Sequence, residues 1–84
     1  MTLPTIHLNG TGAQALLDGY IDAGQAVRAA IDALQAAAPN GRDYYPQGAG
    51  VIGWATQEHN ERCAKLRAVY AELQALAEHV SDHV

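Results

Sequence analysis

Six polar and aromatic residues in the middle of the chain have side chains that could recognise a ligand. Four of them are consecutive within the segment 39–48, and the other two follow at helical spacing further along the chain. Tyrosine rings can stack on a base or another ring, and arginines can donate paired hydrogen bonds to a phosphate or carboxylate. The pattern predicts a ligand-binding site with Trp54 nearby, formed by Arg42, Asp43, Tyr44, Tyr45, His59 and Arg62.

A purely structural role for the same residues stays open. In that alternative, Tyr44 and Tyr45 cover the end of a helical bundle, and Arg42 and Asp43 form a surface pair. Arg62 then lays its aliphatic stem along the helix and extends its guanidinium into water. The sequence alone does not choose between the two interpretations.

Other chemistry has weaker support. His59 with Cys63, and His79 with His83, have the i,i+4 spacing that two metal ligands on a helix could use, but two ligands do not make a site. No nucleophile–base pattern, phosphate-binding loop or dinucleotide fingerprint is present. We therefore expect a protein that is not an enzyme and holds no metal or cofactor.

Length, charge and cysteine content limit the remaining classes. The chain has 84 residues, enough for one small domain spanning 1–84, and a formal net charge of -4. An acidic surface argues against nucleic-acid or anionic-membrane binding, although local arginines could still hold a small anionic ligand. The chain shows no signal peptide and no apolar run of about 20 residues. With Cys63 as the single cysteine, we expect a cytoplasmic protein with no disulfide.

Two long stretches have apolar residues at alternating three- and four-residue spacing, which is typical of amphipathic helices. The first predicted helix spans about 12–38, begins with a capping box at Thr11 and ends before Pro39. Its predicted packing positions are Leu17, Tyr20, Gly24, Val27, Ile31, Leu34 and Ala38. The second spans about 49–80, with packing positions Ile52, Ala55, His59, Arg62, Leu66, Val69, Leu73, Leu76 and Val80.

These elements predict an all-α antiparallel hairpin with an inter-helix loop at 39–48. Residues 1–10 are expected to form a short extended arm that packs Leu3, Ile6 and Leu8 against a helix. Gly24 costs about 1 kcal/mol of helix propensity relative to alanine, which suggests the close approach of another helix. Two helices cannot enclose a core, so we expect self-association into a homo-oligomeric bundle or ring.

The strings Ile6-His7-Leu8-Asn9-Gly10-Thr11 and Asn40-Gly41-Arg42-Asp43-Tyr44-Tyr45-Pro46-Gln47-Gly48 resemble a family of short, uncharacterised phage and prophage proteins. The resemblance covers nearly the whole chain and implies a phage or prophage origin. In size and expected architecture the chain is also similar to the helical-hairpin sponge proteins with which phages sequester cyclic-nucleotide immune signals. That second similarity rests on shape and assigns no site residues.

The resulting functional hypothesis is a non-catalytic protein that sequesters a small nucleotide-like immune signal in the bacterial host cytoplasm. The first alternative is a protein–protein adaptor or inhibitor that acts through its loop and helix faces on a host or phage protein. The second is a structural phage component.

Overall fold

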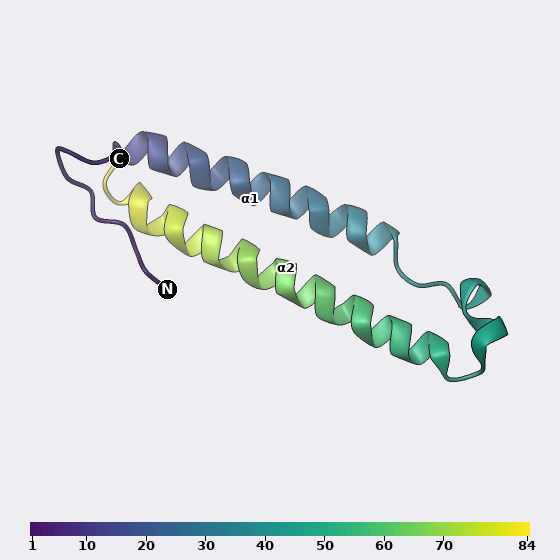
Figure 1. The fold of residues 1–84 in the computed structure, drawn as a ribbon. Helices are drawn as coiled ribbons and strands as arrows, with labels where there is room; N and C mark the ends of the chain where they lie inside the picture. Colours follow the sequence, from purple (N-terminus) through teal and green to yellow (C-terminus); the bar gives the residue numbers. More distant parts are fainter.

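The computed structural model describes residues 1–84 and contains helices and no strands. Two α-helices, α1 (Ala13–Ala36) and α2 (Val51–Ser81), lie antiparallel as a hairpin (Figure 1). Two short 3-10 helices, η1 (Gly41–Asp43) and η2 (Tyr45–Gln47), occupy the connection between them. The predicted all-α hairpin is confirmed.

The helix ends differ from the predicted ones by one or two residues. The capping box predicted at Thr11 is wrong, because the N-cap is Gly12 and no side chain caps the helix. Gln14 donates instead to Asp18, with 2.9 Å between Nε2 and Oδ1. At the other end of α1, the last turn closes through the backbone N–H of Ala37, which donates to Leu34 at 3.0 Å.

The hairpin is long and thin, with extents of 61 × 20 × 17 Å and a radius of gyration of 18.5 Å. A compact chain of this length would have a radius of gyration of about 12 Å. Its core is accordingly small, and the buried residues are Gly24, Ile31, His59, Cys63 and Val80. No helix is long and apolar enough to span a membrane.

The predicted packing positions of α1 are largely confirmed, but those of α2 are partly wrong. Arg62 and Val69 are exposed, whereas Cys63 is buried and Tyr70 is half-buried. The contacting face of α2 is therefore rotated by about one residue, roughly 100° on a helix, at these two positions.

The N-terminal arm is extended and closes with a turn in which Gly10 N–H donates to His7 at 3.1 Å. It doubles back beside the C-terminal end of α2, so that both termini lie at the same end of the hairpin (Figure 1). The carbonyl oxygen of Pro4 lies 2.8 Å from Nε2 of His79, which ties the arm to its own α2. Ile6 is half-buried, but Leu3 is exposed and Leu8 projects fully into solvent. Of the three predicted arm contacts, only that of Ile6 is present.

Candidate functional site

The connection between the helices is an ordered structure. The side chain of Asn40 accepts a hydrogen bond from the backbone N–H of Arg42, with an N–O distance of 2.9 Å, and so begins η1. Pro46 lies in the first turn of η2, where its fixed φ suits the helix and its missing N–H has no partner to lose. Gly48 then turns the chain towards α2 with φ +122°, a conformation essentially restricted to glycine.

A concave surface lies where this connection meets the first turns of α2, and we call it the loop-end hollow. It has a volume of about 230 Å³. Its lining residues come from the inter-helix connection and from the first three turns of α2. It is lined by Pro39, Tyr44, Gln47, Val51, Trp54, Ala55, Glu58 and Arg62.

The loop-end hollow contains one cation and one anion, which face each other. Arg62 NH2 lies 3.6 Å from Oε2 of Glu58 at i,i+4 spacing, and both side chains are more than half exposed. Such an exposed pair contributes only a few tenths of a kcal/mol to stability. It nevertheless makes the hollow close to neutral, so that a bound anion would have to compete with the Glu58 carboxylate for the guanidinium.

The aromatic groups of the hollow have free polar atoms. Trp54 is 68% exposed, although it lies only one turn inside α2. Neither its indole N–H nor the hydroxyl of Tyr44 makes a hydrogen bond within the chain. Each ring therefore offers an apolar surface together with a polar group to an incoming molecule.

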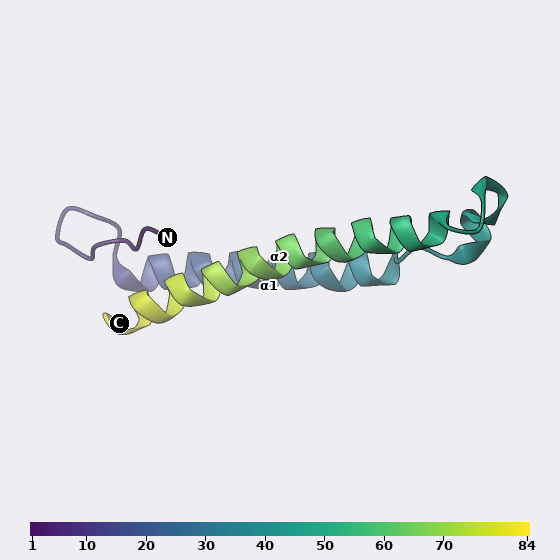
Figure 2. The same cartoon turned by 90° about the horizontal axis from the view of Figure 1, so that it is seen from below.

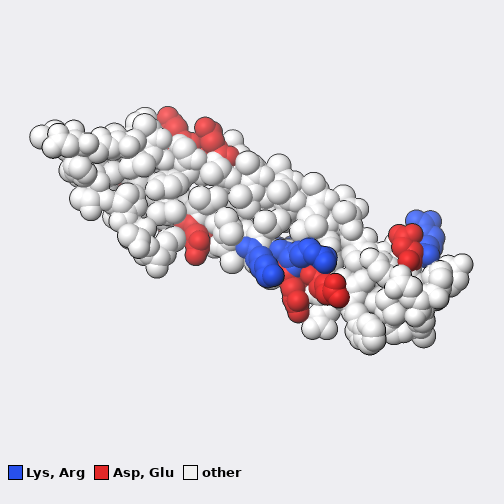
Figure 3. All heavy atoms as spheres, viewed as in Figure 1, with Lys and Arg blue, Asp and Glu red and all other residues white.

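Of the six residues predicted to form the site, the structure brings only Tyr44 and Arg62 into this hollow. Arg42, Asp43 and Tyr45 are exposed and do not line it. Figure 3 shows one cationic and one anionic side chain next to each other at the loop end of the hairpin, apart from the charged groups along the helices. Tyr44 lies between η1 and η2 and is half-buried, whereas its neighbours Asp43 and Tyr45, one in each 3-10 helix, are exposed.

His59 is also outside the hollow. Its residue is 6% exposed and faces α1, with Nε2 3.6 Å from Sγ of Cys63 one turn later. No buried side-chain nitrogen or oxygen in the chain lacks a partner. His59 and Cys63 therefore form a satisfied polar contact inside the helix interface, closed to a ligand.

A second, larger depression runs along the opposite face of the hairpin, midway between its ends. This mid-hairpin groove has a volume of about 390 Å³ and is lined by Tyr20, Ile21, Gly24, Gln25, Arg28, Tyr70, Leu73, Gln74 and Ala77. It adjoins a second depression of about 340 Å³ that shares Arg28 and Tyr70. No local signal in the sequence indicates this groove, because its residues come from both helices and become neighbours only in the hairpin.

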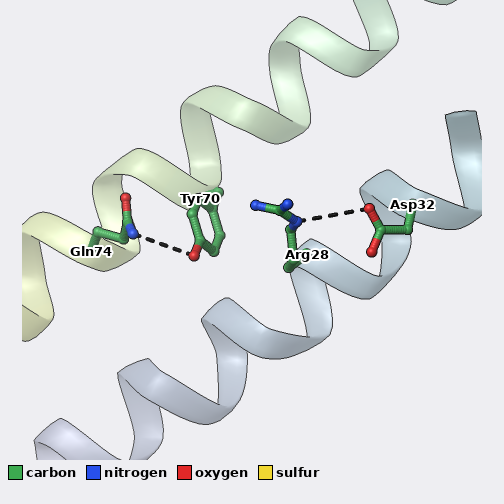
Figure 4. A network of polar contacts seen from close by, with 4 residues as sticks. All are labelled: Arg28, Asp32, Tyr70 and Gln74. Atoms are coloured by element: carbon green, nitrogen blue, oxygen red, sulfur yellow. Dashed lines mark hydrogen bonds and ion pairs between the residues drawn. The ribbon is translucent and has the colours of Figure 1, made fainter.

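Three polar residues of the mid-hairpin groove, Arg28, Tyr70 and Gln74, have partners within the chain. Gln74 donates to the hydroxyl of Tyr70 at 3.3 Å, and Arg28 Nε lies 3.7 Å from Asp32 Oδ1. Figure 4 shows Arg28 reaching from α1 towards the ring of Tyr70 on α2. The groove thus lies between the two helices, and part of its polar lining is already engaged within the chain.

No group of three or more histidine, cysteine or acidic side chains is arranged to hold a metal ion. The rings of His79 and His83 meet edge to face with centroids 5.7 Å apart, and Nε2 of His79 is engaged by Pro4.

Comparison with protein-family models, with curated proteins and with solved structures finds no match for this chain. The fold and the two depressions define a helical-hairpin protein with a small aromatic surface at its loop end.

Proposed function

We propose that the chain is a non-catalytic, self-associating binding protein that recognises a segment of a partner protein at the loop-end hollow. This corresponds to an adaptor or inhibitor. The observation that supports it is the meeting of Tyr44, Trp54 and Arg62 in one concave surface. Tryptophan, tyrosine and arginine are the residue types that contribute most to binding energy at protein interfaces.

The charge of the hollow favours a protein segment over a polyanion. Arg62 is its only cation and is paired with Glu58, while Arg42 lies outside. A phosphate group would have to displace the Glu58 carboxylate in a chain whose net charge is -4. An uncharged side chain and a backbone carbonyl, in contrast, could use the Trp54 ring and the free donors without breaking the pair.

A second candidate is sequestration of a small nucleotide-like molecule. It is favoured by the presence of Tyr44 and Arg62 in the same hollow, since one can stack on a base and the other can bind phosphate. A volume of about 230 Å³ is smaller than the roughly 300–1,000 Å³ usual for small-molecule pockets. This candidate therefore ranks behind the protein segment.

The resemblance to short phage and prophage proteins supports a proposal for where the protein acts. It acts in the cytoplasm of a bacterial host on a host or phage protein. A structural component of the virion, by contrast, would be recovered from purified particles.

The test uses a pair of variants that each remove an exposed apolar side chain. Trp54→Ala removes the exposed ring from the hollow, and Ile21→Ala removes an exposed apolar side chain from the opposite face. Tagged wild-type protein and both variants are purified from infected host cells and compared by quantitative mass spectrometry, with helix content checked by circular dichroism.

A protein captured by the wild type and by Ile21→Ala, but lost with Trp54→Ala, supports the adaptor. Native mass spectrometry of the same preparations measures any small molecule retained. A retained molecule that is lost with Trp54→Ala or Arg62→Ala would replace the adaptor by the sequestration protein. Equal capture by all variants would contradict the loop-end hollow as the recognition surface.

A further inference from the structure

The second helix carries more apolar surface than its single neighbour covers. Its packing residues form three columns at seven-residue spacing, and these are apolar or aromatic except at His59 and Arg62. The central column is His59, Leu66, Leu73 and Val80; a second is Cys63, Tyr70 and Ala77; the third, the Arg62 column, is Ala55, Arg62, Val69 and Leu76. Three apolar columns per heptad are typical of a helix that packs against two neighbours in a bundle.

Only two of these columns are covered along their whole length, because the Arg62 column is half-buried only at its ends, Ala55 and Leu76. The central column and the column of Cys63 and Tyr70 are buried or half-buried along their whole length. In the Arg62 column, Val69 is 44% exposed and the side chain of Arg62 is 57% exposed. This column lies at the edge of the helix interface and has no partner along its middle.

The accessible surface area of the whole chain also indicates that the hairpin packs against an additional partner. Its accessible area is 5901 Å² for a mass of 8.9 kDa. A compact monomer of that mass would expose about 4,800 Å², so that roughly 1,100 Å² remain in excess. Stable protein–protein interfaces bury about 800 Å² per partner, and obligate dimers bury more. One additional helix-on-helix contact would reduce the accessible area of the chain to that of a compact protein of the same mass.

We propose that a second copy of the chain packs on the Arg62 column, with the two α2 helices antiparallel about a twofold axis beside Val69. The product is a four-helix bundle. This inference rests on the self-association proposed above and names the surface that mediates it.

The charged residues beside the Arg62 column determine whether the two α2 helices pack parallel or antiparallel. Glu58, Lys65, Glu72 and His79 repeat at seven-residue spacing beside the Arg62 column. With antiparallel helices and an axis beside Val69, Lys65 of each copy lies next to Glu72 of the second copy. Parallel helices about a twofold axis would place the two flanking columns on opposite sides of the contact, and the Lys65–Glu72 pairs would be lost.

The shape of the hairpin fits this arrangement. Figure 2 shows the N-terminal arm at one end and the inter-helix loop at the other, both standing out to the same side of the two-helix layer. Tyr44 of the loop and Arg62 line the same hollow, so the loop lies on the side of the hairpin that carries the Arg62 column. An antiparallel pair brings the arm end of each copy to the loop end of the other.

This pairing also places the arm near the loop-end hollow. The arm is held at His79, and His79 and His59 are equally far from Val69 along α2. The arm of the second copy therefore lies level with Glu58 and Arg62, at the rim of the hollow. The arm of each copy therefore forms part of the loop-end hollow of the other copy.

The first test compares two substitutions of equal exposure on opposite faces. Val69 is 44% exposed and Ile21 is 43% exposed, so Val69→Asp and Ile21→Asp introduce the same charge at positions of equal exposure. Sedimentation velocity or light scattering at micromolar concentration measures the mass. Val69→Asp is expected to be a helical monomer, and Ile21→Asp and the wild type are expected to be dimers.

The second test locates the axis. In Val69→Cys the two new thiols lie next to each other across the axis, and mild oxidation is expected to give a covalent dimer. Ile21→Cys is expected to remain uncrosslinked, and native Cys63 is 3% exposed and so withdrawn from reaction. Lys65→Glu should weaken the dimer by about tenfold, and adding Glu72→Lys should restore it.

The outcomes separate this inference from the one it rests on. A monomeric wild type would overturn both the self-association and the proposed interface. A dimer that survives Val69→Asp, with no crosslinking through Val69→Cys, would overturn only the interface and leave self-association through another surface.

Discussion

The ring of Tyr70 lies over Gly24 without pressing on it, because a Cβ atom built on Gly24 would be 3.8 Å from Cε2 of Tyr70. This is an ordinary van der Waals distance. The sequence predicts that Gly24 permits the close approach of another helix, and the buried glycine does face α2. The space beside it is nevertheless large enough for a methyl group.

We therefore expect Gly24→Ala to stabilise the hairpin by about 0.5–1 kcal/mol, through improved helix propensity and a less flexible unfolded chain. Chemical denaturation followed by circular dichroism measures the change. Gly19→Ala is the control, since Gly19 is exposed in the same helix and a Cβ there meets nothing within 4 Å. Stabilisation by Gly19→Ala together with destabilisation by Gly24→Ala would mean that the helices approach more closely than this geometry allows.

The rotation of α2 can be tested with two neighbouring residues. Cys63 is buried against α1 and Arg62 is exposed. Cys63→Ala removes a buried sulfur and should cost about 1 kcal/mol. Measured in the monomeric Val69→Asp background, Arg62→Ala loses one surface ion pair and should change the free energy of unfolding by less than about 0.5 kcal/mol. Urea denaturation of both variants measures the two changes, and the opposite order of effects would support the packing positions predicted from the sequence.

Periodicity in the sequence is sufficient to predict both helices, the arm and the length of the connection, because each signal is local. It cannot choose the packing face of α2. The column containing Cys63 and Tyr70 and the column containing Arg62 and Val69 flank the same central residues. The position of α1 determines which of these two columns it contacts. The sequence of α2 alone does not predict that position.

The candidate site is predicted only in part for a similar reason. The sequence groups Arg42, Asp43, Tyr44 and Tyr45 because they are consecutive, but the structure divides them between two 3-10 helices, and only Tyr44, which lies between these helices, lines the hollow. Trp54 belongs to the hollow because the chain turns at Gly48 before α2 begins. That turn depends on the backbone conformation of Gly48. The residue types alone predict a loop there, but they do not predict its conformation.

Gly48 itself leads to a further prediction. With φ +122° and ψ 160°, it occupies a region that is essentially closed to residues with a side chain. Gly48→Ala should cost about 1–3 kcal/mol and displace the first turn of α2, which carries Trp54. Denaturation measures the free energy of unfolding, and the fluorescence of the single tryptophan reports the displacement.

Gly50→Ala provides the matched control for Gly48. Gly50 is the N-cap of α2 and has φ -90°, and a Cβ atom built on it would meet nothing within 4 Å. We expect unchanged fluorescence and little change in stability. Equal effects of the two substitutions would show that the loop tolerates alanine at Gly48 by changing its backbone.

The arm leads to the last prediction, because a single hydrogen bond between residues 75 positions apart ties it to the hairpin. His79→Ala removes the side chain that lies 2.8 Å from the Pro4 carbonyl, and the loss of such a bond costs about 1 kcal/mol. Because about 1 kcal/mol corresponds to a roughly fivefold change in population, limited proteolysis should cleave the arm about five times faster. His83→Ala is the control, since its ring meets His79 only edge to face and the residue is exposed. Unchanged cleavage in His79→Ala would show that Ile6, and not the hydrogen bond, holds the arm in place.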